Sequence, residues 1–224
     1  MCNQTGIEFG KRNLVTGDVE GKRVVEVGSR DVNGTFRQLV APLNPAEYVG
    51  VDIESGPGVD VICDATELLT IFGEESFDVV ISTEMLEHVK DWRNVISNLK
   101  GILRPGGTML ITTRSKGFAY HAYPYDFWRF EREDMQAIFS DMKIEVLESD
   151  SPSEPGVFVV VKKPNGFAEN KLAKVALYSI ISGKRKRKIG FVSEGLFKAR
   201  SSMAPLRYRL LASVRYRFGK LMGR

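Results

Sequence analysis

The sequence has few of the residues on which several classes of protein depend. Its 224 residues include two cysteines, Cys2 and Cys63, and two histidines, His88 and His121. So few cysteines exclude a disulfide-stapled scaffold, and the wide spacing of all four residues predicts no metal site. No apolar run approaches the roughly 18 residues that a membrane-spanning helix needs. The chain also opens without a charged-then-apolar leader, so we expect a cytoplasmic protein.

Acidic residues are scarce in one part of the chain. Residues 165–224 contain 15 Lys or Arg against 2 Asp or Glu, a net charge of +13, whereas residues 1–164 carry −9. Apolar residues recur at helical spacing near the end of the chain, among arginines and a lysine, at Leu206, Leu210, Val214, Phe218 and Leu221. The sequence therefore predicts a body at 1–164 and a basic amphipathic helical extension at 165–224.

The role of this extension stays open among three alternatives. It could pack on the body with its charged face in solvent, or hold the protein peripherally at an anionic membrane surface. It could also contact nucleic acid through phosphates. Nucleic acid is less favoured, because the acidic body offers an RNA strand no basic path.

Strand-like and helix-like segments alternate along the body, which predicts an α/β fold around a parallel sheet with right-handed crossovers. The last two strands are joined by a short loop, so we expect them to pair antiparallel. The expected strands are 22–27, 47–52, 59–63, 77–82, 108–113, 143–148 and 156–162, and the expected helices are 33–41, 64–72, 92–103 and 131–142.

Candidate ligand-binding residues follow the first three strands. Gly28 lets a ligand lie against bare backbone above a helix N-terminus, Asp52 is placed to accept hydrogen bonds from ribose hydroxyls, and Asp64, followed by Ala65, suits an adenine amino group. Each residue alone favours a turn or a helix cap. Their order at successive strand ends favours one nucleoside site, because open α/β sheets bind ligands at that edge. The absence of G-x-G-x-x-G argues against a dinucleotide.

These segments together resemble the class I S-adenosylmethionine-dependent methyltransferases over about residues 20–163. Residues 84–89 (EMLEHV) are similar to the LEH stretch of the subgroup that methylates small molecules, quinones and sugars. The first motif departs from the family, which has two or three closely spaced glycines, because Gly28 is followed by no glycine before Gly34. The matching segments are 26–29, 48–52, 61–65, 77–82 and 103–107.

The resemblance implies a Rossmann-like, seven-stranded, mostly parallel sheet with one antiparallel strand and helices on both faces, and S-adenosyl-L-methionine as cofactor. Ser82 and Thr83 are implied to lie near the methionine portion of the cofactor, and Gly34 is left without a role. The other implied cofactor contacts are Glu26, Gly28, Ser29, Asp52, Ile53, Asp64 and Ala65.

An aromatic-rich segment at 114–130 follows the fifth strand, where loops of such sheets carry substrate residues. Its H-x-Y-P-x-D-x-W-R pattern resembles a stretch of bacterial and archaeal methyltransferases that we connect loosely with glycan or lipid-linked sugar modification. His121 is the first candidate for general base, because its ordinary pKa lies nearest neutrality. Asp126 could orient His121 or act instead, and His88 is the rival base.

We therefore expect O-methylation of a saccharide, a glycolipid or another small hydroxylated acceptor. Three alternatives remain: a tRNA or rRNA methyltransferase, an NAD-dependent dehydrogenase, and a non-catalytic S-adenosylmethionine-binding module.

Overall fold

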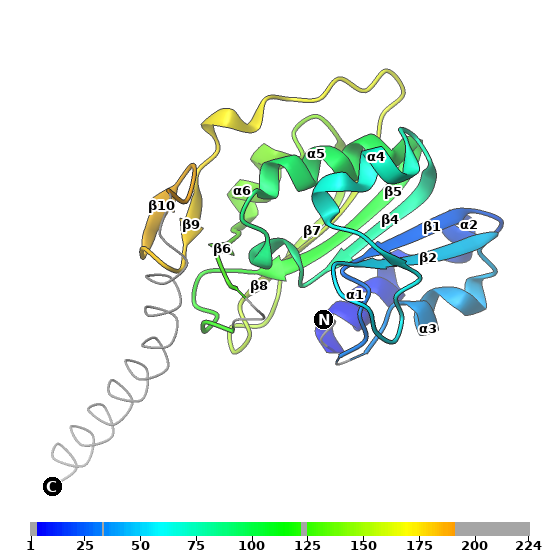
Figure 1. The fold of residues 1–224 in the computed structure, drawn as a ribbon, viewed down its shortest axis with the longest axis horizontal. Helices are drawn as coiled ribbons and strands as arrows, with labels where there is room; N and C mark the ends of the chain where they lie inside the picture. The colour runs from blue at the N-terminus through cyan, green and yellow to red at the C-terminus, as the bar shows by residue number, and fades with distance from the viewer. Residues whose placement is uncertain (1–3, 33, 122–124, 191–224) are drawn as a thin grey trace, which may run out of the picture.

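A seven-stranded sheet forms the centre of the molecule (Figure 1). The computed structural model describes residues 4–32, 34–121 and 125–190. The strand order is β3-β2-β1-β4-β5-β8-β7, and β8 runs antiparallel to both of its neighbours while the other pairs are parallel. The predicted topology is thus confirmed. The strands are β1 (Arg23–Val27), β2 (Glu47–Asp52), β3 (Val61–Ile62), β4 (Phe77–Thr83), β5 (Leu103–Arg114), β7 (Lys143–Ser149) and β8 (Gly156–Lys162).

Helices cover both faces of this sheet, as the resemblance implies (Figure 1). The central strands carry apolar side chains on both of their faces, so their alternating side chains enter two separate cores. Val25 and Val80 belong to the larger core, and Val24 and Val79 belong to the smaller one. The larger core packs against α4 (Leu68–Phe72), α5 (Trp92–Ile102) and α6 (Arg132–Ile138), and the smaller against α1 (Gln4–Asn13), α2 (Thr16–Val19) and α3 (Arg37–Val40).

Helix α5 illustrates how this packing follows from the sequence. Trp92, Val95, Ile96, Leu99 and Ile102 are all fully buried, and their spacing of three and four places them on one face of the helix. Each such side chain contributes about 1.5–3 kcal/mol through burial. The helix predicted over 92–103 is therefore confirmed.

The C-terminal part of the described chain differs from the predicted helical extension. Residues 165–190 contain a short 3-10 turn (Leu172–Lys174) and two strands, β9 (Leu177–Ser179) and β10 (Lys184–Lys186). Strand β9 pairs with β6 (Trp128–Arg129), which lies inside the aromatic-rich segment, and the three strands form a second sheet in the order β10-β9-β6.

Residues 165–190 are mainly extended and not α-helical because side chains of the body bind their backbone. The guanidinium of Arg93 donates hydrogen bonds to the carbonyls of Leu172 and Val175, and Leu177 is fully buried. Residues 165–190 are thus part of the fold. The amphipathic helix predicted near the end of the chain lies outside the described residues.

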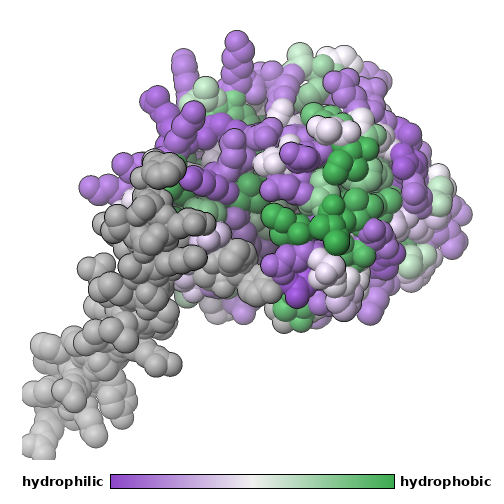
Figure 2. Space-filling model, in the orientation of Figure 1, coloured by the Kyte–Doolittle hydropathy of each residue, from purple (hydrophilic) through white to green (hydrophobic). Residues whose placement is uncertain are grey.

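Exposed apolar side chains lie at the ends of β2 and β3. Ile53 is 64% exposed and Ile62 is 63% exposed, and Figure 2 shows apolar side chains gathered on the face that carries α4. Within 4–32, 34–121 and 125–190, no helix has the length and apolarity needed to cross a membrane.

Candidate active site

Gly28 ends β1 in a backbone conformation that requires glycine. Its φ is 86°, and an added Cβ would lie 2.9 Å from the Cβ of Met85. The amide groups of Gly28 and Ser29 both donate to the carbonyl of Val51 (2.8 and 3.0 Å), which ties this turn to β2. The Ser29 hydroxyl is buried and has no hydrogen-bond partner within the described chain. The turn therefore brings bare backbone and an open polar group to the sheet edge.

Asp52 ends β2 beside this turn. Its carboxylate accepts hydrogen bonds from the backbone amides of Arg30 (3.2 Å) and Glu54 (3.1 Å). A carboxylate has about four acceptor positions, so two remain for the hydroxyls of a ribose. The neighbouring Ile53 offers exposed apolar surface that a purine ring would cover. These residues fit the nucleoside portion of S-adenosylmethionine.

Asp64 and Ala65 follow β3, next to Asp52 along the same edge. Residues Asp52 and Ile62 are register partners in the parallel pair of β2 and β3. The Asp64 carboxylate caps the 3-10 turn Ala65–Glu67 by accepting from the amide and the hydroxyl of Thr66, both at 2.8 Å. These bonds use one carboxylate oxygen, so the other oxygen is the one that could receive an adenine amino group.

Glu26 lies inside the fold, where its side chain is 2% exposed. The hydroxyl of Tyr48 donates a 2.5 Å hydrogen bond to its carboxyl group. Burial raises the pKa of Glu26 to about 7, and the bond from Tyr48 offsets part of that rise. The described contacts place Glu26 as a buried support behind the Gly28 turn, and its predicted contact with the cofactor stays a prediction.

Ser82 and Thr83 end β4 and are both buried. The Ser82 hydroxyl has no hydrogen-bond partner among residues 4–32, 34–121 and 125–190. Strands β1 and β4 are neighbours, with Val27 opposite Ser82. Ser82 therefore adjoins the Gly28 turn, where the resemblance puts the methionine portion of the cofactor.

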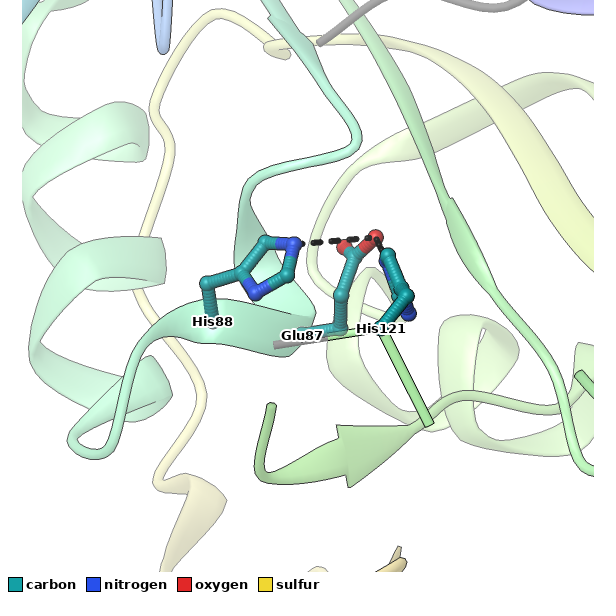
Figure 3. A group of neighbouring side chains, drawn as sticks. All are labelled: Glu87, His88 and His121. Carbon is teal, nitrogen blue, oxygen red and sulfur yellow. Dashed lines mark ion pairs between the residues drawn. The ribbon is translucent and has the colours of Figure 1, made fainter. Parts of the chain in front are cut away.

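The next residues of the chain bring the candidate catalytic side chains together (Figure 3). Glu87 and His88 belong to the 3-10 turn Leu86–His88 after β4, and His121 comes from the segment after β5. One oxygen of Glu87, Oε1, lies 3.9 Å from Nε2 of His88 and 3.5 Å from Nε2 of His121. The two imidazole rings are 4.8 Å apart. The two histidines that are alternative candidates for the general base thus lie in one site.

Glu87 is the centre of this cluster, and the sequence analysis did not select it. It is fully buried, and its second oxygen accepts a 2.7 Å hydrogen bond from the hydroxyl of Thr113. Burial alone would raise the pKa of Glu87, but His121 and His88 outweigh burial and hold it at about 2. The signal available in the sequence was position, because Glu87 directly precedes a candidate base.

Asp126 is brought to the other side of His121, as predicted. Its Oδ2 lies 3.0 Å from Nδ1 of His121, and both of its oxygens also accept from the guanidinium of Arg129. Burial lowers the pKa of His121, but the carboxylates of Asp126 and Glu87 beside it outweigh burial and raise the pKa to about 9. Arg129 and His121 hold the pKa of Asp126 far below its ordinary value despite burial. Asp126 is therefore suited to orient His121.

A second buried acid, Glu84, lies three residues before Glu87. Its φ of 52° is uncommon for a residue other than glycine, and its carboxylate forms an ion pair with the guanidinium of Arg114. Burial and the charge of Glu87 raise the pKa of Glu84 to about 8, while Arg114 opposes the rise. Backbone strain at a buried acid is typical of functional sites. No pattern in the sequence indicates that Glu84 is strained or buried.

The candidate site thus lies at the carboxyl ends of β1, β2 and β4, the edge at which open α/β sheets bind ligands, with a polar cluster beside it. Solved methyltransferase structures share this fold. The 1,6-didemethyltoxoflavin-N1-methyltransferase of Burkholderia thailandensis has a TM-score of 0.59 at 16% identity, over 73% of this chain and 80% of that one. Phosphoethanolamine N-methyltransferase 2 of Haemonchus contortus has a TM-score of 0.55 at 18% identity, over 72% and 52%.

The sequence comparisons agree with the fold. The methyltransferase-domain family matches residues 8–146, so the chain belongs to that family, and its fold is that of the class I S-adenosylmethionine-dependent methyltransferases. The ubiquinone biosynthesis O-methyltransferase of Parvibaculum lavamentivorans is 39% identical over 70 residues, 31% of this chain and 27% of that protein. The phthiotriol/phenolphthiotriol dimycocerosates methyltransferase of Mycobacterium tuberculosis is 32% identical over 116 residues, 47% and 42%. The chain thus spans less than half the length of these curated relatives.

Proposed function

We propose that this protein transfers a methyl group from S-adenosylmethionine to a hydroxyl group of a saccharide, a glycolipid or another small hydroxylated acceptor. The observation that carries the proposal is the buried cluster of Glu87, His88, His121 and Asp126 beside the cofactor edge. A hydroxyl is a weak nucleophile until its proton is removed, and such clusters serve proton removal. The printed name of one relative, an O-methyltransferase, agrees with this choice.

The cofactor supplies a methyl group on a positively charged sulfur, which a nucleophile displaces in line. The residues that would hold it lie along the sheet edge. The backbone of the Gly28 turn would contact the cofactor, and Asp52 would bind its ribose. Ile53 would pack against the purine, and Ser82 would lie near the methionine portion. Since the donor is already reactive, accurate positioning can supply most of the acceleration.

The cluster removes the acceptor's proton. His121 and Asp126 have the arrangement of a base and its orienting carboxylate, with 3.0 Å between Nδ1 and Oδ2. Because the pKa of His121 is raised to about 9, His121 accepts a proton only in the molecules in which its ring is neutral, and this fraction grows as the pH rises. His88 is the alternative, because its Nδ1 lies 2.5 Å from the carbonyl of Tyr125. A carbonyl only accepts, so this nitrogen carries the hydrogen and Nε2 of the neutral ring keeps a lone pair.

Aromatic side chains around the cluster favour a flat or ring-shaped acceptor. The ring of Phe118 lies 4.9 Å from that of His121, and the guanidinium of Arg114 lies 4.1 Å from the centre of the Phe118 ring. Tyr125 and Phe127 form a second aromatic pair, with 5.7 Å between ring centres. Aromatic faces beside charged hydrogen-bonding groups suit the apolar face and the hydroxyls of a sugar.

The basic residues 184–188 favour a membrane-bound acceptor at an anionic surface. All five are exposed, and β10 is joined through β9 to β6 in the aromatic-rich segment. Each Lys or Arg near an anionic leaflet contributes about 1 kcal/mol to binding. We therefore propose peripheral association with the inner face of the membrane, next to a lipid-linked saccharide. RNA is the second candidate, but the acidic body does not support it.

Calorimetry with purified protein tests the proposal first. We expect binding of S-adenosylmethionine and none of NAD, and the reverse result would favour a dehydrogenase. A panel of hydroxylated and amine acceptors then separates the remaining cases by product mass. Methyl transfer to RNA alone, or cofactor binding with no turnover on any acceptor, would contradict the proposal.

A further inference from the structure

We propose that Glu87, His88 and His121 form a binding site for a divalent transition-metal cation such as Zn²⁺, which binds the acceptor oxygen. The inference rests on the proposed function and adds how the cluster acts on the hydroxyl. The three residues each direct one ligand atom to a common point, and these atoms all lie within 4.8 Å of one another (Figure 3). Two imidazole nitrogens and one carboxylate oxygen are ligands that Zn²⁺ and similar ions prefer.

Two of the three distances between ligand atoms approach those that a bound cation requires, and all three atoms lie within 4.8 Å of one another. Ligand bonds of about 2.0–2.1 Å place two ligand atoms of a tetrahedral ion about 3.3 Å apart. Nε2 of His121 lies 3.5 Å from Oε1 of Glu87, and Nε2 of His88 lies 3.9 Å from it. Small rotations of the side chains would complete the geometry.

Two of the ligand atoms lack the partners that buried polar atoms normally have. Oε1 of Glu87 and Nε2 of His88 are buried with no hydrogen-bond partner in the described part of the chain, and Glu87 is fully buried. Leaving such atoms unpaired destabilises the folded protein. A cation at this point would satisfy both atoms at once.

The outer contacts are those that orient histidine ligands in metal sites. The other ring nitrogen of a metal-bound histidine usually donates to a carbonyl or a carboxylate. Here Nδ1 of His88 lies 2.5 Å from the carbonyl of Tyr125, and Nδ1 of His121 lies 3.0 Å from Asp126. The remaining oxygen of Glu87 accepts from Thr113 at 2.7 Å. Glu87 and His88 are thus held from behind by hydrogen bonds, and the carboxylate of Asp126 lies behind His121.

Three protein ligands leave one position of a four-coordinate cation open for the acceptor. A hydroxyl bound there loses its proton more readily because the cation stabilises the negative oxygen. With the cation bound, His88 and His121 act as its ligands, and water takes the place of the histidine base. The O–H bond breaks, the proton passes to water, and the oxygen keeps the electron pair with which it attacks the methyl carbon. The carbon–sulfur bond then breaks and its electron pair stays on the sulfur.

Metal binding is measured directly on untagged full-length protein, first stripped with a chelator. Titration with ZnCl₂, and with CoCl₂ followed by visible absorption, should show a single equivalent bound, and anomalous scattering should place the ion between the three ligand atoms. Glu87→Gln, His88→Ala and His121→Ala should each weaken binding at least about tenfold. Glu145→Gln, the same change at an exposed carboxylate of β7, and Cys63→Ser should leave binding unchanged.

Thermal unfolding separates loss of the site from loss of the fold. Added Zn²⁺ should raise the melting temperature of the wild type and of both control variants, but not of the ligand variants. Absence of binding by the wild type, or equal binding by Glu87→Gln and His121→Ala, would overturn the inference. Methyl transfer to a hydroxyl that survives complete metal removal would overturn the metal's role alone. Metal binding with transfer only to nitrogen would instead overturn the proposed function.

Discussion

The hydroxyl of Tyr48 on β2 donates a 2.5 Å hydrogen bond to the buried carboxyl of Glu26 on β1. The two strands pair in parallel, with Val24 opposite Tyr48 and Glu26 opposite Gly50. This contact fixes a titratable group directly behind the Gly28 turn, where the cofactor is proposed to bind.

The first prediction concerns the stability of the free protein against pH. Burial raises the pKa of Glu26 from 4.5 to about 7, so the folded state keeps a proton that the unfolded state has lost. The contribution of Glu26 to the free energy of unfolding is greatest below about pH 4.5. It falls as the pH rises and is lower by about 3 kcal/mol above pH 7. Urea unfolding of Glu26→Gln across this range should show a flatter dependence than the wild type. Parallel curves for the two proteins would contradict the assignment.

The second prediction is that Asp52 contributes affinity for the cofactor. Hydrogen bonds to a charged group contribute about 1.5–3 kcal/mol, so Asp52→Ala should weaken S-adenosylmethionine binding by about tenfold or more. The measurement is calorimetric titration, with circular dichroism as the check on folding. The matched variant Asp60→Ala removes a carboxylate that pairs with Arg37 and with the amide of Gly50, and it should lose less affinity for the cofactor. Unchanged affinity in a folded Asp52→Ala protein would refute the role.

The third prediction separates chemistry from cofactor binding at the cluster. His121→Ala should lower turnover strongly while the affinity for S-adenosylmethionine stays nearly intact, because His121 is proposed to face the acceptor. His88→Ala is the paired experiment, since the two rings are 4.8 Å apart. Full activity of His121→Ala with loss in His88→Ala would make His88 the base. Full activity in both would remove the cluster from the mechanism.

The fourth prediction concerns the exposed basic residues 184–188, which include β10. Changing Lys184, Lys186 and Lys188 to Gln removes three positive charges and leaves the ion pair between Arg185 and Asp134 in place. Co-sedimentation with anionic vesicles should fall markedly and should also fall with added salt in the wild type. Neutral vesicles are the control. Equal binding of the variant to anionic vesicles, or an RNA gel shift without vesicle binding, would contradict membrane association.

Much of the fold could be predicted from the sequence because local patterns and packing agree there. Apolar runs such as 77–82 predict buried parallel strands, and the spacing of Trp92, Val95 and Leu99 predicts an amphipathic helix. The order of Gly28, Asp52 and Asp64 at successive strand ends predicts a cofactor-binding edge, which stays a prediction. For the strands and the helix, the information lies within one element of secondary structure.

The remaining features depend on contacts between distant segments. Pairing of β9 with β6, and the hydrogen bonds from Arg93, make residues 165–190 part of the fold, and no local pattern encodes them. Likewise, Glu87 and His121 are far apart in sequence and meet only because β4 and β5 are neighbours. The absence of a metal motif in the sequence could not exclude a metal site built in this way.

The most direct test of the central claim uses S-adenosylmethionine with a deuterated methyl group. The purified protein is incubated with lipid and glycan extracts of cells that lack its gene, and labelled products are located by mass spectrometry. The account predicts deuterium in a methyl ether of a hydroxylated, saccharide-containing acceptor, with the label strongly reduced for His121→Ala. Label on nitrogen, or no labelled product with any extract, would contradict it.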